Sequence, residues 1–301
     1  MAKRSLVSAT RIRGLVAREA PRVLLLRRGP TRQVATIMWH TDSNEFYFGQ
    51  WFKGRIYEHV SDLSPSGKRL IYRAETHRGP YKQWTAISRP PFITALTLWA
   101  GGGAWGGGGI FDSETRIRLN HGSSKSKPED GFAVPPGVQV STYDEWTNPK
   151  KQWPLQLTLF QRNEWAIQQA EVAAYSKGGR RAWKIETPEI RWKRRGKWIL
   201  ESSVVRYGGP GEPGTVRHFR MLDDDGDCRL DLGECDWADW SYDGRLLFAR
   251  DGCVFDAPVS KARGPGGANE RLDLRAMKFE AIASPEEARR WTGEVVGRRI
   301  K

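Results

Sequence analysis

The sequence predicts an all-β fold in which one hairpin unit recurs. Two stretches, residues 62–72 (DLSPSGKRLIY) and 239–248 (DWSYDGRLLF), share one pattern. In both, a polar turn closed by glycine leads into bulky apolar residues, which is typical of a tight turn with positive φ before a strand buried between sheets. The 32 Gly and 17 Pro suit many short strands and turns, and the 14 Trp suit a core between stacked sheets.

The spacing of weaker hairpin echoes predicts the architecture. Their turns fall near residues 66, 114, 162, 195 and 243, which leaves gaps of 48, 48, 33 and 48 residues. Propeller blades repeat at roughly 40–50 residues. We therefore expect a β-propeller of about five four-stranded blades, with six as the alternative. A strand within residues 22–28 is expected to join the last blade and close the ring, which leaves no exposed sheet edge.

The two clear hairpins also resemble those of a known family. Residues 62–72 and 239–248 are similar to the Ser-Pro-Asp-Gly-Lys hairpin of TolB-like and Trp-Asp-repeat β-propellers. The resemblance covers these two hairpins, with Ser66 in place of the family's Asp and Tyr242 in place of its Pro. It implies a ring of four-stranded blades, which usually serves as a binding platform and only sometimes as an enzyme.

The ends of the chain differ in composition from its middle. We expect a basic extension over residues 1–21, the propeller over 22–283 and a short, basic helical tail over 284–301, which opens with a Ser-Pro-Glu-Glu helix start. Arginines interrupt the first 20 residues, whereas a secretory signal needs about 7–15 uninterrupted apolar residues. No run approaches the roughly 18 apolar residues of a membrane span. These features predict a cytoplasmic, monomeric protein that does not enter a membrane.

The three cysteines fit the same compartment. Cys228, Cys235 and Cys253 are odd in number and form no Cys-x-x-Cys pair, so we expect no disulfide framework. A Cys228–Cys235 bridge across a hairpin is the alternative that remains open.

The sequence contains no recognisable catalytic motif. Gly101, Gly103 and Gly106 match Gly-x-Gly-x-x-Gly, but residues 109–119 after them alternate as strands, whereas a dinucleotide site needs a helix there. A glycine-rich surface loop is therefore the preferred interpretation. Asp62 and Asp239 occupy matching repeat positions, which favours a structural hydrogen-bonding role over general acid or base catalysis.

Basic charge is the feature that says most about partners. The formal net charge is +14, and residues 177–197 carry nine basic against two acidic residues, or +7. The basic residues of this segment are Lys177, Arg180, Arg181, Lys184, Arg191, Lys193, Arg194, Arg195 and Lys197. Interleaved tryptophans at 183, 192 and 198 suit stacking on nucleic-acid bases. The alternative is that the tryptophans pack between blades while the cations face solvent.

A second charged stretch has the spacing of a calcium-binding loop. Asp223, Asp225, Asp227, Asp231 and Glu234 fall at positions 1, 3, 5, 9 and 12 of an EF-hand-like loop. Cys228 stands where the loop needs glycine, and the flanks have the pattern of strands. A charged hairpin turn is the preferred interpretation and calcium binding the alternative; no other cofactor is expected.

Three functions follow from these features. The first is a non-enzymatic propeller that acts as a scaffold or recognition module for another macromolecule, with a protein as its expected partner. The second is a nucleic-acid-binding propeller that uses residues 177–197. The third is a propeller hydrolase or lyase with its site in the central channel.

Overall fold

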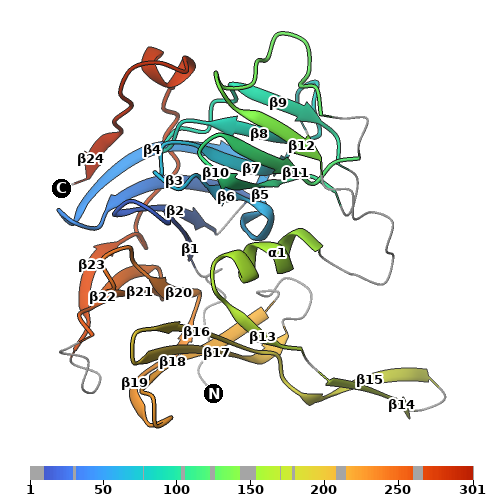
Figure 1. The fold of residues 1–301 in the computed structure, drawn as a ribbon, viewed down its shortest axis with the longest axis vertical. Helices are drawn as coiled ribbons and strands as arrows, with labels where there is room; N and C mark the ends of the chain where they lie inside the picture. Colours follow the sequence, from blue (N-terminus) through green and yellow to red (C-terminus); the bar gives the residue numbers. More distant parts are fainter. Residues whose placement is uncertain are drawn as a thin grey trace.

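The computed structural model describes residues 10–29, 32–76, 78–102, 106–122, 126–142, 154–169, 171–177, 180–207, 215–259 and 267–300. Within these ranges the chain forms five sheets, one two-stranded ribbon and a single α-helix, α1 (Pro154–Arg162) (Figure 1). None of the helices in them is long and apolar enough to cross a membrane. The prediction of an all-β protein is confirmed.

The sheets follow one another along the chain. The first has the order β1 (Arg11–Val16), β2 (Arg22–Arg28), β3 (Gln33–His40), β4 (Glu45–Lys53) and β24 (Arg298–Ile300). The second has β5 (Arg55–Ile56), β7 (Leu70–Glu75), β8 (Gln83–Ser88) and β9 (Thr97–Ala100), with β6 (Asp62–Leu63) also paired to β7. The third has β10 (Gly109–Ser113), β11 (Arg116–Leu119) and β12 (Gln139–Thr142), of which β11 and β12 are parallel.

The last two sheets and the ribbon complete the described strands. The fourth sheet has the order β13 (Ala166–Gln168), β16 (Ile190–Arg195), β17 (Trp198–Tyr207), β18 (Thr215–Leu222) and β19 (Cys228–Cys235). The fifth has β20 (Trp237–Trp240), β21 (Leu246–Arg250), β22 (Cys253–Ala257) and β23 (Asn269–Asp273). The ribbon consists of β14 (Glu171–Lys177) and β15 (Arg180–Thr187).

The first sheet is buried on both faces, which explains its long apolar runs. In β2, Val23 and Leu25 belong to a core cluster with the fifth sheet, whereas Leu24 and Leu26 belong to a cluster with the second sheet. Successive side chains of a strand point to opposite faces, so a strand between two sheets needs apolar residues at every position. The Val-Leu-Leu-Leu run therefore places the first sheet between the second and the fifth.

The two hairpin copies have equivalent turns. Gly67 has φ of +73° and Gly244 has φ of +85°, as the sequence predicts. The backbone N–H of Gly67 donates to the carbonyl of Ser64 at 2.8 Å, and that of Gly244 donates to the carbonyl of Ser241 at 3.0 Å. Only glycine adopts this left-handed conformation without strain, so both copies depend on it.

The strands after these turns are also equivalent. In β7, Leu70 and Tyr72 face the first sheet, while Ile71 faces the third. In β21, residues 246 and 248 face the fourth sheet, while residue 247 faces the first. Both strands are thus buried between two sheets, as expected from their uninterrupted apolar sequences.

Core clusters link successive elements of the chain. Clusters join the first sheet to the second, the second to the third, the fourth to the fifth, and the fifth back to the first. Helix α1 contributes Leu155 and Leu159 to a cluster with Val60 and Ile110, and its Phe160 packs on the cluster of the fourth and fifth sheets. A closed ring of blades stays a prediction.

The expected boundary at the N-terminus is wrong. Residues 11–16, which we assigned to a basic extension, form β1 and pair with β2 along its whole length. The strand in residues 22–28 consequently lies inside the first sheet, and β1 occupies the sheet edge, where it contacts β20 and β21 of the fifth sheet. Burial of Ile12 against that sheet accounts for the difference.

The expected C-terminal helix is reduced to one 3-10 turn, η4 (Glu286–Arg289), followed by β24. The guanidinium of Arg89 donates to the carbonyls of Glu287, Arg290 and Thr292 at 2.8, 3.0 and 2.7 Å. These bonds satisfy carbonyls at and just beyond the end of the single turn, where the backbone offers no further helical donors.

Helix α1 replaces a hairpin that the sequence predicts around residue 162. We expected strands over residues 155–160 and 164–168, but only the second part contains one, β13. The chain enters α1 at Pro154, which suits a first helical position because it has no N–H to leave unpaired.

Candidate binding site

Elements from four of the sheets surround a cavity of about 500 Å³. Its wall is formed by β1, β16 and β20, together with the turn η1 (Glu58–Val60), Asp62 of β6 and helix α1. Figure 1 shows α1 between the third and the fourth sheets. The cationic side chains of the wall are Arg13, Arg18, Arg162, Arg191, Lys193, Arg195 and Arg217. Five carboxylates oppose these seven cations: Glu19, Glu58, Asp62, Glu164 and Asp239.

The two repeat aspartates have the structural role that the sequence predicts. Asp62 receives both terminal nitrogens of Arg162, at 2.5 and 2.7 Å, and the backbone N–H of Phe111 at 2.7 Å. Asp239 accepts a hydrogen bond from Lys193 at 2.8 Å. Each aspartate therefore ties the inner strand of its sheet to a neighbouring element, and charge-assisted bonds of this kind are among the strongest in proteins.

Strand alternation divides the basic residues of β16 between two faces. Arg191, Lys193 and Arg195 line the cavity, whereas the exposed Trp192 and Arg194 lie between them in the sequence. This is the two-residue period of a strand with one face toward the cavity and the other toward solvent. The basic residues that the sequence groups together in β16 therefore form two sets, one facing the cavity and one facing solvent.

Arg191 lies in an arginine-rich part of the cavity. Its guanidinium contacts Glu189 at 2.6 Å and stacks on the ring of Phe160 at 3.9 Å from the ring centre. The same Glu189 also receives Arg217, so one carboxylate serves two guanidiniums. Burial, and after it the charge of Arg217, lowers the pKa of Arg191 to about 10. The Nε atom of Arg191 is buried without a hydrogen-bond partner among the described residues.

Two further cavity arginines have no carboxylate partner within the described part of the chain. The side chain of Arg13 in β1 makes no salt bridge or hydrogen bond there, although it lines the cavity. Arg18 donates to the carbonyls of Phe111 and Asp112, at 3.0 and 3.4 Å, and its Nε is buried and unpartnered. Burial, and then the charge of Arg162, lowers the pKa of Arg18. The cavity wall thus retains positive charge that its own carboxylates leave unmatched.

Apart from Arg195, whose exposed side chain also lies at the cavity wall, the remaining residues of the predicted basic segment lie on the surface or in the ribbon. Arg194 pairs with Asp224, Arg195 donates to the carbonyl of Tyr242 at 2.6 Å, and Lys197 lies 5.1 Å from the ring centre of Trp198. Lys177, Arg180, Arg181 and Lys184 belong to the ribbon backbone, and their side chains lie outside the described part. Trp192 is 38% exposed.

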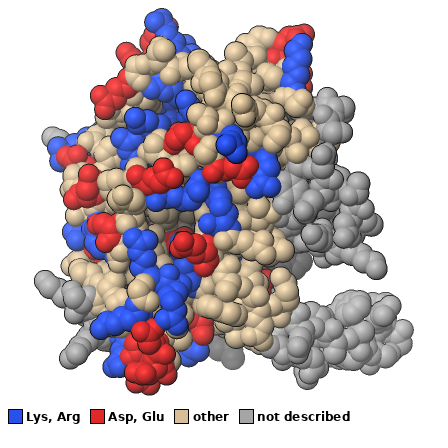
Figure 2. Space-filling view, viewed as in Figure 1, with Lys and Arg blue, Asp and Glu red and all other residues tan. Residues whose placement is uncertain are grey.

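Basic and acidic side chains are interspersed over the face shown in Figure 2. In the described structure, salt bridges such as Arg220–Glu201 (2.6 Å) and Arg298–Glu280 (2.7 Å) pair basic with acidic side chains. Although the chain has a net charge of +14, its lysines and arginines therefore do not form one uniform basic patch on this face.

The calcium-loop candidates form a hairpin turn between β18 and β19. Asp223 accepts the backbone N–H groups of Asp225 and Asp227, at 3.1 and 2.9 Å, and its other oxygen receives Arg229. Further along, Asp231 accepts from His218 at 2.5 Å, and Glu234 lies on β19. No three of these five carboxylates converge within 4.8 Å in the described structure.

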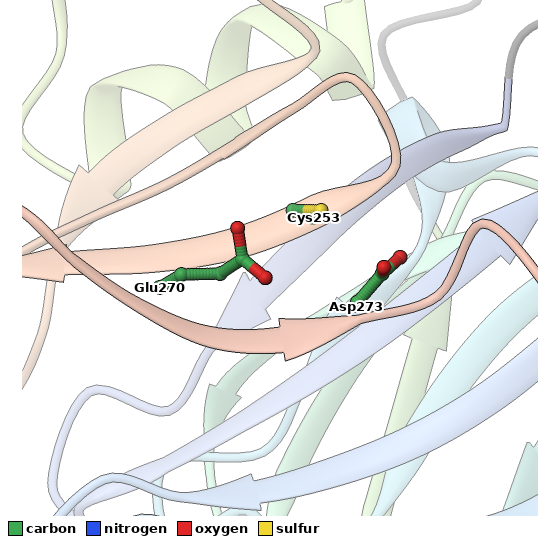
Figure 3. Close-up of side chains that lie close together, drawn as sticks. All are labelled: Cys253, Glu270 and Asp273. Carbon is green, nitrogen blue, oxygen red and sulfur yellow. The ribbon is translucent and has the colours of Figure 1, made fainter.

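One other group of side chains in the described residues has the geometry to hold a metal ion. The ligand atoms of Cys253, Glu270 and Asp273 lie within 4.8 Å of one another across β22 and β23 (Figure 3). Burial, and then the charge of Asp273, raises the pKa of the Cys253 thiol to about 11. Both oxygens of Asp273 already bind Arg275, at 3.0 and 2.7 Å. A metal would have to displace that arginine and deprotonate a thiol that burial keeps neutral.

The cysteines and the glycine-rich loop have structural roles. All three cysteines are free, so the alternative of a Cys228–Cys235 bridge is wrong for this structure. The loop leads into β10, as its sequence predicts, although Gly103 lies outside the described residues. A Cβ atom on Gly108 would lie 2.1 Å from the carbonyl oxygen of Val60, so close packing requires glycine here.

Sequence reasoning did not find the arginines that line the cavity outside β16. Arg13 and Arg18 were assigned to the N-terminal extension, Arg162 to a hairpin turn, and Arg217 to an ordinary strand. The alternation of Arg11, Ile12 and Arg13 was the available signal for β1. No local signal brings Arg162 to Asp62, since 100 residues separate them.

Comparisons of the chain with protein-family models, with curated proteins and with solved structures found no match. Its function is therefore inferred from its own residues and their geometry.

Proposed function

We propose that the protein is a non-enzymatic recognition module that binds an acidic macromolecule, with its sheets arranged as the blades of a propeller. The observation that carries the proposal is the ribbon of β14 and β15, a basic two-stranded arm that extends away from the sheets in Figure 1. An acidic protein segment is the partner that we propose first.

The core clusters support the propeller arrangement. Apolar clusters join the first sheet to the second, the second to the third, the fourth to the fifth and the fifth to the first, while α1 lies between the third and fourth. The edge strands β1 and β20 and the penultimate strand β16 line one cavity, as the blades of a propeller surround a central channel. Such a ring gives a rigid base on which a protruding arm is held.

The ribbon has the register of a tight hairpin with a basic tip. Lys177 pairs with Arg180 and Ser176 with Arg181, so the last backbone pairs of the two strands are formed by polar and basic residues. Cations concentrated at the end of an arm contact a partner before the rest of the molecule does, and opposite charges raise the rate of association. This arrangement favours recognition of an acidic surface.

Nucleic acid is the second candidate, and the shape of the ribbon favours it specifically. The major groove of B-DNA admits a two-stranded β-ribbon. Lysine and arginine at the tip of the arm would neutralise phosphates. In a plot of log affinity against log salt concentration, each phosphate contact with duplex DNA would then add roughly 0.9 to the downward slope. A protein partner would show a weaker dependence on salt.

A titration with defined polyanions tests both candidates. The full chain is titrated at low and moderate salt with fluorescently labelled single-stranded DNA, duplex DNA and a polyglutamate peptide. The ribbon variant Arg180→Glu/Arg181→Glu is compared with Arg289→Glu/Arg290→Glu, which changes the net charge equally on exposed residues of the C-terminal segment. We expect the ribbon variant to lose binding and the control to retain most of it.

Affinity purification with and without nuclease then separates the candidates. A captured protein that survives nuclease and is lost with the ribbon variant supports the acidic protein partner. Capture that nuclease abolishes supports nucleic acid. Equal binding by both variants, or no binding to any polyanion at low salt, would rule out a role for the ribbon.

A further inference from the structure

The cavity contains a group of arginines whose charges are not balanced by the chain itself. Arg13 and Arg191 face it from different sheets, and the charge of Arg13 acts on Arg191. Arg217 lies beside Arg191 and shares Glu189 with it. The Nε of Arg191 has no partner among the described residues, and the side chain of Arg13 has no hydrogen bond or salt bridge there.

Counting the neighbouring ionised groups leaves two positive charges over. The cavity wall is lined by seven cations and five carboxylates. Burial lowers the pKa of His59 in the same wall, so this ring adds no charge at pH 7. Seven minus five gives +2, which a single dianion would balance. Unbalanced charge in a partly buried site repels itself, and a bound anion relieves that repulsion.

The chemistry of the arginines favours an oxyanion. A guanidinium presents its donors in a planar fork that matches the oxygens of phosphate or carboxylate in two parallel hydrogen bonds. Two such groups from different strands can hold a tetrahedral anion from two sides. A dianionic phosphate matches the excess of two charges, whereas a carboxylate would neutralise half of it.

The walls next to these arginines suit an organic group attached to the phosphate. Phe160, Trp165 and Trp237 line the same cavity, and Phe160 stacks against Arg191. The volume of about 500 Å³ falls in the range of small-molecule pockets, roughly 300–1,000 Å³. Inorganic phosphate alone would leave the aromatic walls uncovered.

We propose that the cavity binds the phosphate monoester of a small organic molecule, with Arg13 and Arg191 as the phosphate ligands and the aromatic side chains around its organic part. This site is distinct from the ribbon of β14 and β15, and it does not depend on the function proposed for the ribbon.

Calorimetric titration of the full chain tests the site. The probes are adenosine monophosphate, glycerol 3-phosphate and inorganic phosphate, with acetate as the monoanionic control, in a chloride buffer of low ionic strength. We expect the monoesters to bind with Kd below about 1 mM and more tightly than inorganic phosphate. Acetate should bind more weakly than all three.

Variants of one arginine on each face of the wall give the matched comparison. Arg13→Gln should weaken monoester binding by at least about tenfold, because a hydrogen bond to a charged group is lost. Arg13→Lys keeps the charge but not the fork and should fall between Arg13→Gln and the unchanged chain. Arg194→Gln, on the solvent face of β16, should change affinity less than about twofold.

Thermal unfolding distinguishes a loss of binding from a loss of folding in these variants. Without ligand, Arg13→Gln should melt close to the unchanged chain, because the side chain of Arg13 makes no hydrogen bond or salt bridge within the described residues and its charge acts on both cations and carboxylates. With monoester, the unchanged chain and the Arg13→Lys variant should gain stability, because both keep a cation at this position, whereas Arg13→Gln should not. If the monoester raises the melting temperature of Arg13→Gln as much as that of the unchanged chain, or binds neither, the proposed site does not exist.

Discussion

At the scale of single residues, two aspartates show how the repeat organises the molecule. Asp62 and Asp239 occupy the same position in their hairpins, and each accepts a hydrogen bond from a cation of a neighbouring element. The sequence predicts this structural role from the repeat alone. It does not predict the partners, Arg162 and Lys193, because these come from elements that fold next to the hairpins only in three dimensions.

The turn glycines give a prediction about residues. Gly244→Ala should cost about 1–2 kcal/mol, because an alanine is strained at its φ of +85° while the space around it is open. Gly67→Ala should cost more, since its Cβ would also lie 3.0 Å from Arg22 and 3.3 Å from Ala17. Urea unfolding at an unchanged m-value measures both costs.

A glycine without a positive φ serves as the control. Gly122 has nothing within 4 Å of an added Cβ, so Gly122→Ala should leave the unfolding midpoint nearly unchanged. If Gly67→Ala and Gly244→Ala were equally harmless, the two turns would not share the strained geometry on which the repeat rests.

At the scale of elements, α1 shows why local patterns mislead. Residues 155–159 (LQLTL) alternate between apolar and polar types, which predicts a strand. The structure instead buries Leu155 and Leu159, which are four residues apart and lie on one side of a helix. Pro154 was a competing helix signal, and burial against the third sheet decided between the two patterns.

The contact between the last sheet and the first strand gives a prediction about pH. Asp236, just before β20, accepts the backbone N–H of Ile12 at 3.1 Å, and burial raises the pKa of its carboxyl to about 6. The folded chain therefore holds this proton more tightly than the unfolded chain. The resulting stability is present at pH 4 and is lost as the pH rises to about 6.

Asp236→Asn removes the titration but keeps an oxygen that can accept from Ile12. We subtract the free energy of unfolding of the unchanged chain from that of this variant. The difference should increase between pH 4 and pH 7, because only the unchanged chain loses stability over this range. Denaturant unfolding at several pH values measures it, with Asp130→Asn at an exposed position as the control. A stability difference that stays constant across this range would mean that Asp236 is not desolvated in the folded chain.

At the scale of the whole molecule, the sequence predicts the class and the repeated hairpins but not the cavity. Strand alternation, turn glycines and apolar runs act over a few residues, and these were read correctly for β7 and β21. The cavity depends on pairs such as Arg18 with Phe111, which lie 93 residues apart. No local pattern encodes such distances, so the sequence, which placed its basic site at residues 177–197, did not predict the cavity.

The strand β1 leads to the last prediction, which concerns how the molecule is held together. β1 pairs with β2, contacts the fifth sheet through Ile12, and contacts the third through the neighbouring Arg18. A chain that begins at Thr10 retains all of these contacts. A chain that begins at Pro21 loses them, exposes the edge of β2 and uncovers apolar surface of the fifth sheet.

The shorter chain should therefore unfold at a much lower urea concentration or fail to fold. Burial of Ile12 alone is worth roughly 1.5–3 kcal/mol, and the lost strand pairing adds to it. A synthetic peptide of residues 10–20, added to the chain that begins at Pro21, should restore part of the stability in a concentration-dependent manner. Equal unfolding midpoints for the two chains would show that β1 is an accessory strand, and the other strands of the first sheet would then have to provide its contact with the fifth sheet.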